Sequence, residues 1–283
     1  MAETVGRAGL GNSIYRFLTQ DEGRPRTYGL VVDRRQQDVG EATLDLRDLA
    51  ALANDHPGVC AFGKIALLAD EGIHTFQINR HGEHGVVFCG NSTAAALACL
   101  NGNGELRTAL FGMADAPYEV AAQSAGGAIA QTWTLPASRI EERDWRGRRT
   151  LALHALNHYV LILGDLPAGI CPEAARQELL GPSVGGKLAV ISDDADAATV
   201  HFYNSNGRHG AVPQTGIASV ALAAREIGWL AQRFADGFLT YIADDEPRRA
   251  ALPPIVEAED GRLRLRMPDI EVVLSPLVRD LAA

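Results

Sequence analysis

The sequence predicts an α/β (α+β) protein built from two pseudo-symmetric lobes, each a curved sheet around a central helix. Three observations lead to this prediction. Most patterned segments have the features of short strands, only two have the features of buried helices, and part of the sequence occurs twice. The chain has 283 residues, which suffices for two lobes of roughly 130 to 140 residues each.

Short apolar or alternating runs of about four to eight residues predict strands along the whole chain. In the first half these runs are 13–18, 28–33, 64–68, 74–78, 106–110, 118–122 and 127–134. In the second half they are 159–163, 188–192, 200–203, 238–242 and 263–267.

Two alanine-rich segments, 91–100 and 215–227, predict buried helices, because small side chains on every face allow a helix to lie inside a curved sheet. The segment 136–149 contains a run of charged residues and predicts a linker. We therefore expect an N-terminal lobe at 1–135 and a C-terminal lobe at 136–283, with the option that the last strand returns to the first lobe.

An internal repeat supports this division. The segments 79–98 (NRHGEHGVVFCGNSTAAALA) and 204–223 (NSNGRHGAVPQTGIASVALA) share 8 of 20 positions without a gap. Upstream of them, 63–68 (GKIALL) matches 186–191 (GKLAVI). Because alanine richness does not explain the shared glycines and histidines, we interpret the halves as homologous lobes that face each other across a cleft.

The composition excludes several classes of function. With 35 acidic and 26 basic residues the net charge is −9, so the basic stripe of a nucleic-acid binder is missing. No apolar run reaches the roughly 18 to 20 residues of a membrane span, and no signal peptide is visible. The cysteines Cys60, Cys89, Cys99 and Cys171 form no C-x-x-C pair, which favours a reduced, cytoplasmic location.

Each repeat carries a turn of small and polar residues directly before its predicted helix, CGNS at 89–92 and PQTG at 213–216. A helix N-terminus offers free backbone N–H groups and the positive end of the helix dipole, so it attracts a carboxylate. A cysteine there has a lowered pKa, which favours the thiolate. The alternative is that Cys89 is an inert core cysteine and that the residues after it are an ordinary helix cap.

Several short motifs, taken in chain order, resemble those of the diaminopimelate epimerase superfamily. They are Gly9-Leu10-Gly11-Asn12, the turn 58–63 (GVCAFG), Asn79-Arg80-His81-Gly82, Cys89-Gly90-Asn91, Asn157-His158 and Thr215-Gly216. The family fold has two pseudo-symmetric lobes with one central helix each, which is also what the internal repeat predicts. The resemblance implies a set of substrate-binding residues, namely Asn12, Asn79, Gly90, Asn91, Asn157, Thr215 and Gly216.

The resemblance also implies a mechanism. In the family, two cysteines exchange one proton across the α-carbon of the substrate, without a metal or a cofactor. Cys89 stands where the first cysteine is expected, but Pro213 stands at the place of the second and has no proton to give. Residues 204–206 and 188–191 replace further polar contacts of the family, which argues against diaminopimelate itself as the substrate.

Two other branches of the superfamily resemble the second turn more closely. Phenazine-biosynthesis-type isomerases have a proline turn there, and methylaconitate isomerases have an H-x-A-x-x-x-T-G pattern similar to 209–216. These relatives shift a double bond with a single base. The methylaconitate group uses a lysine upstream of its C-G-N turn, where this chain has Lys64, although the same window also fits the epimerase turn. The chain has only two lysines, Lys64 and Lys187, which we attribute to codon bias.

His84 and His209 occupy equivalent positions in the repeat, shortly before the two turns. An imidazole titrates near neutral pH, so His209 is a candidate partner for Cys89 in proton transfer. The alternative is that each histidine only caps a strand end. A histidine metal site is not expected, since no second ligand follows at helical spacing.

The sequence therefore predicts a cofactor-independent isomerase of the epimerase or racemase kind, with Cys89 and His209 as catalytic residues. Its substrate is expected to be a small carboxylate or an amino acid. An allylic isomerase, a single-base dehydratase or lyase, and a non-catalytic carboxylate-binding protein remain open as alternatives. We expect a monomer or a homodimer, with no nucleic acid and no membrane as partner.

Overall fold

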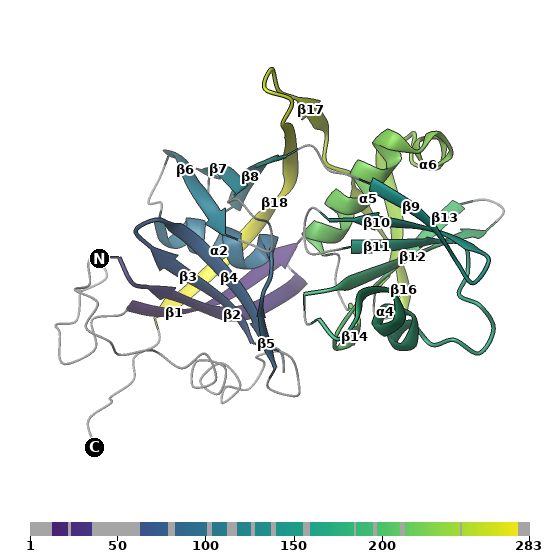
Figure 1. The fold of residues 1–283 in the computed structure, drawn as a ribbon. Coiled ribbons are helices and arrows are strands. Elements are labelled where there is room, and N and C mark those ends of the chain that lie inside the picture. The colour runs from purple at the N-terminus through teal and green to yellow at the C-terminus, as the bar shows by residue number, and fades with distance from the viewer. Residues whose placement is uncertain are drawn as a thin grey trace.

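The chain forms two curved sheets beside each other, each packed around one long helix (Figure 1). The computed structural model describes residues 13–21, 24–35, 63–78, 83–100, 104–111, 118–125, 128–136, 140–154, 159–183, 185–194, 197–209, 213–243 and 245–276. None of the helices in these ranges is long and apolar enough to cross a membrane.

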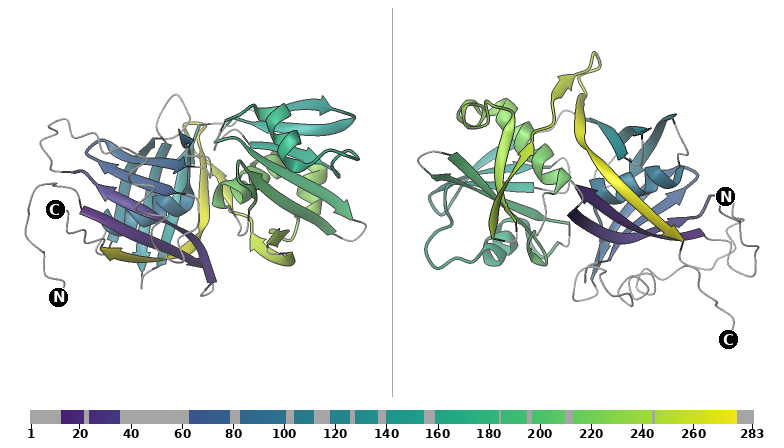
Figure 2. Two further views of the ribbon diagram at one scale, coloured as in Figure 1. Left: turned by 90° about the horizontal axis from the view of Figure 1, so that it is seen from below. Right: turned by 180° about the vertical axis from the view of Figure 1, so that it is seen from behind.

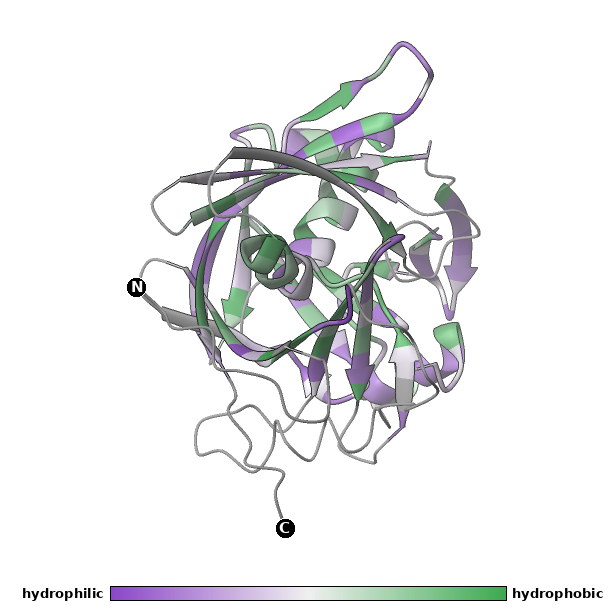
Figure 3. Ribbon diagram, turned by 90° about the vertical axis from the view of Figure 1, so that its left-hand side faces the viewer, coloured by the Kyte–Doolittle hydropathy of each residue, from purple (hydrophilic) through white to green (hydrophobic). Residues whose placement is uncertain are grey.

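The first sheet closes on itself around a helix. Its main path runs in the order β1-β2-β3-β4-β6-β7-β8-β18, and β1 also pairs with β18. Figure 3 looks along this ring, with helix α2 (Gly90–Leu100) inside it. The strands are β1 (Ser13–Asp21), β2 (Arg24–Asp33), β3 (Lys64–Ala69), β4 (Gly72–Ile78), β5 (His84–Val86), β6 (Gly104–Phe111), β7 (Tyr118–Ala125), β8 (Ala128–Leu135), β17 (Ile255–Glu257) and β18 (Leu263–Pro276).

The second sheet is open and carries three helices. Its order is β16-β15-β13-β12-β11-β10-β9, with β14 paired to β13. The strands are β9 (Ile140–Trp145), β10 (Arg148–Leu153), β11 (Tyr159–Leu163), β12 (Lys187–Asp194), β13 (Ala197–Asn204), β14 (Gly207–Arg208), β15 (Phe238–Ala243) and β16 (Glu246–Ala251). The helices are α4 (Pro172–Leu180), α5 (Gln214–Glu226) and α6 (Gly228–Arg233).

The two sheets share one topology, which confirms the predicted pseudo-symmetric α/β fold. The path β10-β11-β12-β13-β15-β16 repeats β1-β2-β3-β4-β6-β7, and the parallel pairs β2–β3 and β4–β6 recur as β11–β12 and β13–β15. Strand β18 comes from the end of the chain and lies in the first sheet, between β8 and β1 (Figure 2).

Helix α2 is buried because the first sheet surrounds it, and α5 is buried because it packs against the second sheet, α6 and β18. In α2 the residues from Gly90 to Leu97 are all buried, and in α5 the residues from Gln214 to Ala224 are. A helix covered on every side has no face for charged side chains, which explains its alanine-rich sequence. Trp133 is among the largest fully buried side chains, and its ring lies 4.6 Å from that of Phe88 in an edge-to-face arrangement.

The prediction of a linker at 136–149 is wrong, because most of this segment belongs to the hairpin β9–β10 of the second sheet. Charged residues alternate on its exposed faces and pair with one another, as Arg149 does with Glu142 and Arg143 with Glu141. Strand β9 at the edge of the sheet buries little, so it lacks the apolar alternation that identifies a half-buried strand. Strand β10 does bury Leu151 and Leu153 in the core, and only its first two residues fall within the predicted linker. Helices α4 and α6 were not predicted either.

The core should depend strongly on Trp133. We expect Trp133→Ala to lower the free energy of unfolding by about 3 to 5 kcal/mol, since it removes a fully buried ring from a close-packed core. Urea unfolding followed by circular dichroism measures the change. Arg149→Ala, which breaks only an exposed ion pair, should leave the unfolding midpoint nearly unchanged. A similar midpoint shift for both variants would contradict this view of the core.

Candidate active site between the two helix starts

The N-termini of α2 and α5 meet, as the sequence predicts. A Cβ atom added to Gly90 would lie 2.1 Å from Gln214 Oε1 and 2.8 Å from Trp133 Cζ2. Glycine at the start of α2 therefore allows the first residue of α5 to approach. Gln131 connects the two starts, since its Nε2 donates to Gly90 O at 3.2 Å and to Gln214 Oε1 at 3.4 Å.

A small cavity lies at this junction and receives residues from both sheets. Five of its lining residues are candidates from the sequence, namely Cys89, Gly90, Asn91, His209 and Thr215. The other lining residues are Thr27, Lys64, Lys187, Pro213 and Gln214. The structure thus brings the two predicted turns together around one space.

Gly216 and His84 are described but do not line this cavity. Gly216 is buried behind the cavity, where a Cβ atom would come within 2.6 Å of the Phe202 ring. His84 begins β5 and pairs with Ile78 in the sheet ladder. The candidates Asn12, Asn79 and Asn157 fall outside the described residues.

Two lysines of the site were not among the predicted site residues: Lys187 was not considered, and Lys64 was considered only through its resemblance to the lysine of the methylaconitate group. Lys64 and Lys187 are the only lysines of the chain, they begin the equivalent strands β3 and β12, and they are only 9% and 3% exposed. The attribution to codon bias is therefore corrected, because both line the Cys89 cavity. The available signal was the repeated pair GKIALL and GKLAVI, in which the lysine itself recurs.

Neutral acceptors hold the two ammonium groups. Lys64 Nζ donates to Gln77 Oε1 at 2.5 Å, and Lys187 Nζ donates to Thr215 Oγ1 at 3.2 Å. Lys187 Nζ also lies 5.9 Å from the centre of the Tyr159 ring. Among the described residues no aspartate or glutamate is buried, and none lines the cavity. Because buried charges normally have an opposite partner, this excess of positive charge favours an anion in the cavity.

The lysines determine the ionisation of Cys89. Burial raises the pKa of its thiol, but the ammonium groups of Lys64 and Lys187 and the hydrogen bonds from Ser92 lower it, and the net pKa lies below the ordinary value. Cys89 directly precedes the first residue of α2, where the helix dipole acts in the same direction. By contrast, burial raises the pKa of Cys99 to about 12.

The pKa of Lys187 is lowered, whereas an exposed salt bridge would raise the pKa of a lysine. Burial and the neighbouring Lys64 charge lower its pKa to about 7, against the opposing effect of Cys89. Burial also raises the pKa of Tyr159, so this phenol stays neutral beside it. The site therefore contains a cysteine with a lowered pKa and a lysine whose pKa is lowered to about 7.

Two buried side-chain amide atoms near the cavity could form hydrogen bonds with a ligand. Asn91 Nδ2 donates to Thr27 Oγ1 at 2.7 Å, but Asn91 Oδ1 has no hydrogen-bond partner among the described residues. The same holds for Nε2 of Gln77, whose oxygen accepts from Lys64. Buried polar groups without partners are costly, and they are often satisfied by a ligand.

The thiolate leads to a prediction for alkylation. The rate of Cys89 modification by iodoacetamide should rise with pH through a midpoint below that of a free cysteine, about 8.5, because only the thiolate reacts. Mass spectrometry of peptides from a pH series measures this midpoint, and a free cysteine in the same reaction is the comparison. Equal midpoints for Cys89 and the free cysteine would contradict the effect of the lysines.

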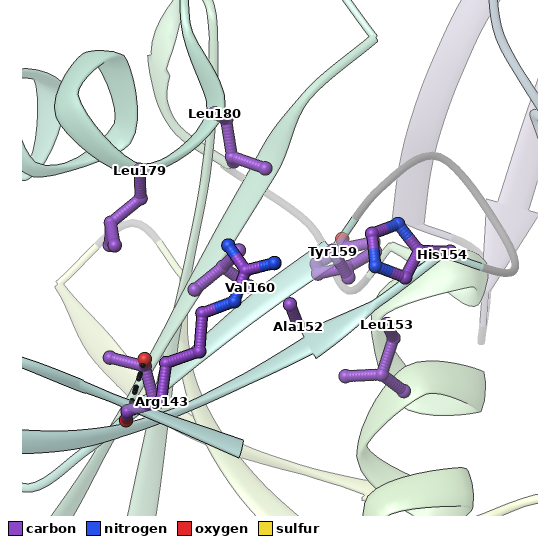
Figure 4. A pocket seen from close by; sticks show the side chains of 9 residues that line it. Arg143, Ala152, Leu153, His154, Tyr159, Val160, Leu179 and Leu180 are labelled. Atoms are coloured by element: carbon purple, nitrogen blue, oxygen red, sulfur yellow. Dashed lines mark hydrogen bonds between the residues drawn. The ribbon is translucent and has the colours of Figure 1, made fainter. Parts of the chain in front are cut away.

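A second cavity, of about 200 Å³, lies in the second sheet (Figure 4). Its lining consists mainly of aliphatic side chains, together with Arg143, His154 and Tyr159. The Arg143 guanidinium pairs with Glu141, and the carboxylate of Glu141 also lies 3.7 Å from Nε2 of His154. This cavity contains no cysteine or lysine, and we therefore place the candidate active site at Cys89. In the described part of the chain, no cluster of metal-ligating side chains was found.

Comparison with solved structures identifies the fold. The structure matches a predicted epimerase from Pseudomonas aeruginosa with a TM-score of 0.59 and 13% identity, over 95% of this chain and 100% of that one. It matches phenazine biosynthesis proteins of the PhzF family from Enterococcus faecalis (TM-score 0.52, 12% identity) and Bacillus anthracis (0.55, 8% identity), each over 95% of this chain and 100% of the other. The chain has a PhzF-type fold.

The two-lobed fold with one central helix in each lobe, which the sequence resemblance implied, is therefore confirmed. No family model and no curated protein matches the sequence. At these low identities the PhzF-type fold alone is shared, and the chemistry of the site has to be argued from its own residues.

Proposed function

We propose that this protein is a cofactor-independent isomerase that moves a proton on a small carboxylate or amino acid through the Cys89 thiolate. The observation that carries this proposal is the pairing of Cys89 with two buried lysines at the junction of two helix starts. A buried thiol that only filled space would need no charged neighbours, and two buried ammonium groups without a carboxylate would be costly. Structural neighbours named as a predicted epimerase and as phenazine biosynthesis proteins support an isomerase-type enzyme.

The site has parts suited to each requirement of such a reaction. The free N–H groups at the starts of α2 and α5, together with the lysines, can hold the substrate carboxylate. The same positive charges stabilise the negative charge that develops when a proton leaves the adjacent carbon. Cys89 can accept that proton because its pKa lies below that of an ordinary thiol.

Access to the site requires movement. The cavity is too small for an amino acid, so residues from the two sheets would have to move apart for such a substrate to bind. Closure after binding would then exclude water from the thiolate and strengthen the electrostatic contacts. Burial of Cys89, which is only 6% exposed, is compatible with a catalytic role in such a closed state.

An allylic isomerase or a single-base lyase would use the same thiolate and differ only in where the electrons go. Pro213 favours these alternatives, because it provides no second acidic group at the start of α5. A non-catalytic carboxylate-binding protein would use the same anion cradle, that is, the two lysines and the N–H groups at the two helix starts. The ionisable cysteine beside the two lysines argues against it, since binding an anion needs only the positive charges.

The direct test is isotope exchange. L-Alanine, L-proline, L-glutamate and crotonate are incubated with the enzyme in D₂O, and loss of the α- or γ-proton is followed by proton NMR. We expect exchange for at least one compound, and change of configuration or a shifted double bond in the same sample. Tight binding of a carboxylate without any exchange would support the binding-protein alternative.

The anion cradle predicts a preference that can be measured separately. Each carboxylate of the panel is compared with its primary amide, which has the same shape but no charge. We expect the amides to bind at least about tenfold more weakly, since they lose the charge-assisted contacts to the lysines and the helix starts. Isothermal titration calorimetry measures the affinities. Equal affinity of the acid and its amide would exclude the cradle.

A further inference from the structure

Cys89 can remove a proton from the substrate, but isomerisation also needs a group that returns a proton to another face or another carbon. Helix α2 begins after Cys89, and helix α5 begins after Pro213, so these two residues occupy equivalent places. The ungapped sequence repeat instead pairs Cys89 with Gln214, and the structure shifts this equivalence by one residue. Neither Pro213 nor the amide of Gln214 is a useful acid or base. A proton delivered to another face or another carbon therefore has to come from elsewhere.

We propose that Lys187 is the second proton-transfer group of this site and works together with Cys89. This inference rests on the proposed function. Lys187 comes from the second sheet, whereas Cys89 and Lys64 come from the first. Its Nζ is held 3.2 Å from Oγ1 of Thr215, in the first turn of α5. The amine is thus fixed at the second helix start, as the sulfur is at the first.

The surroundings of Lys187 suit a group that gains and loses a proton. Its side chain is 3% exposed, and the charged or titratable neighbours that share its cavity are Lys64, Cys89 and His209, with Tyr159 beneath it. Burial and Lys64 favour the neutral amine, while the Cys89 thiolate favours the ammonium form. The protonation of Lys187 is therefore coupled to that of Cys89.

The proton inventory balances without any other reactant. The cycle starts with a Cys89 thiolate and a Lys187 ammonium group. Sγ takes the proton from the substrate carbon, forming an S–H bond, and the electron pair of the broken C–H bond remains on the substrate as a stabilised carbanion. An Nζ–H proton then forms the new C–H bond, which leaves a thiol and a neutral amine. The reverse reaction starts from this second form.

The lowered pKa values suit both groups to proton transfer. Burial and the charge of Lys64 lower the pKa of Lys187 to about 7, so its ammonium group can release a proton near neutral pH. The pKa of Cys89 is also lowered, which favours the thiolate that accepts a proton. General acid–base catalysis is most effective when the pKa of the catalytic group lies near the working pH.

The presence of only two lysines makes a direct test possible. Protein labelled with [¹³Cε]-lysine should show two lysine signals, assigned with the variants Lys64→Arg and Lys187→Arg. We expect the Lys187 signal to titrate near pH 7. In Cys89→Ser its midpoint should fall, because the ammonium form loses the neighbouring negative charge. A Lys187 midpoint near the ordinary lysine value of about 10.4 would overturn the proposal. So would a midpoint that is the same in Cys89→Ser and in the wild type.

Exchange measurements separate this proposal from the proposed function. Arginine keeps the positive charge but does not release its proton, so Lys187→Arg preserves the anion contact and removes the acid–base role. With the panel compound that the wild type isomerises fastest, we expect on the order of a hundredfold or greater loss of isomerised product. Exchange of the proton facing Cys89 should persist, because the thiolate can return a deuteron to the same face.

Two results would reject Lys187 and leave the isomerase intact. One is full isomerisation by Lys187→Arg. The other is loss of isomerisation in His209→Asn together with its retention in Lys187→Gln, which would make His209 the second group. Full exchange in Cys89→Ser would instead reject the proposed function. The outcomes of the two proposals are therefore distinguishable.

Discussion

Replacing Cys89 with serine should abolish nearly all exchange of substrate protons with D₂O, with a loss on the order of a hundredfold to ten-thousandfold. Serine has nearly the same size, so the start of α2 should remain intact. Its hydroxyl, however, does not ionise near neutral pH, even beside Lys64 and Lys187. Proton NMR of the panel compounds in D₂O measures the loss, and calorimetry should show that binding of the carboxylate survives.

Cys171→Ser is the matched control for this variant. Cys171 is exposed at the N-cap of α4, away from the cavity, and serine is a good residue at that position. We expect it to exchange substrate protons as the wild type does. Equal activity of Cys89→Ser and the wild type would show that the thiolate is not the base, whereas equal loss in both variants would indicate a general effect of cysteine replacement.

The fold was largely predictable because the repeat and the strand pattern are local signals. Helices α2 and α5 stand out by their alanine content, and the turns before them mark where they begin. Strand β9 and helix α4 were missed because they carry few buried apolar side chains, so hydrophobic periodicity identifies them poorly.

The site was only partly predictable, and the lysines show why. A lysine at the start of a strand is most often exposed, and nothing local distinguishes Lys64 or Lys187 from a surface residue. Their role depends on the two strands β3 and β12 bringing them to one cavity beside Cys89. Their recurrence in the repeat was visible, but its chemical meaning follows only from burial and from the absence of a buried carboxylate in the described residues.

The second large effect is expected at Gly90. In Gly90→Ala, the new methyl group would lie 2.1 Å from Gln214 Oε1 and 2.8 Å from Trp133 Cζ2. The two helix starts then have to move apart, which we expect to lower the free energy of unfolding by about 1 to 3 kcal/mol. Exchange activity should fall on the order of a hundredfold, since small displacements at the reacting groups are costly.

Gly228→Ala is the control, because a Cβ at this exposed start of α6 meets nothing within 4 Å. It should leave both stability and exchange close to the wild type. The double variant Gly90→Ala with Gln214→Gly tests the cause, since it removes the atoms that the new methyl group approaches most closely. If contact between the helix starts closes the site, the double variant should recover part of the stability lost in Gly90→Ala. A Gly90→Ala protein with wild-type stability and full exchange would show that the two starts do not need to meet for catalysis.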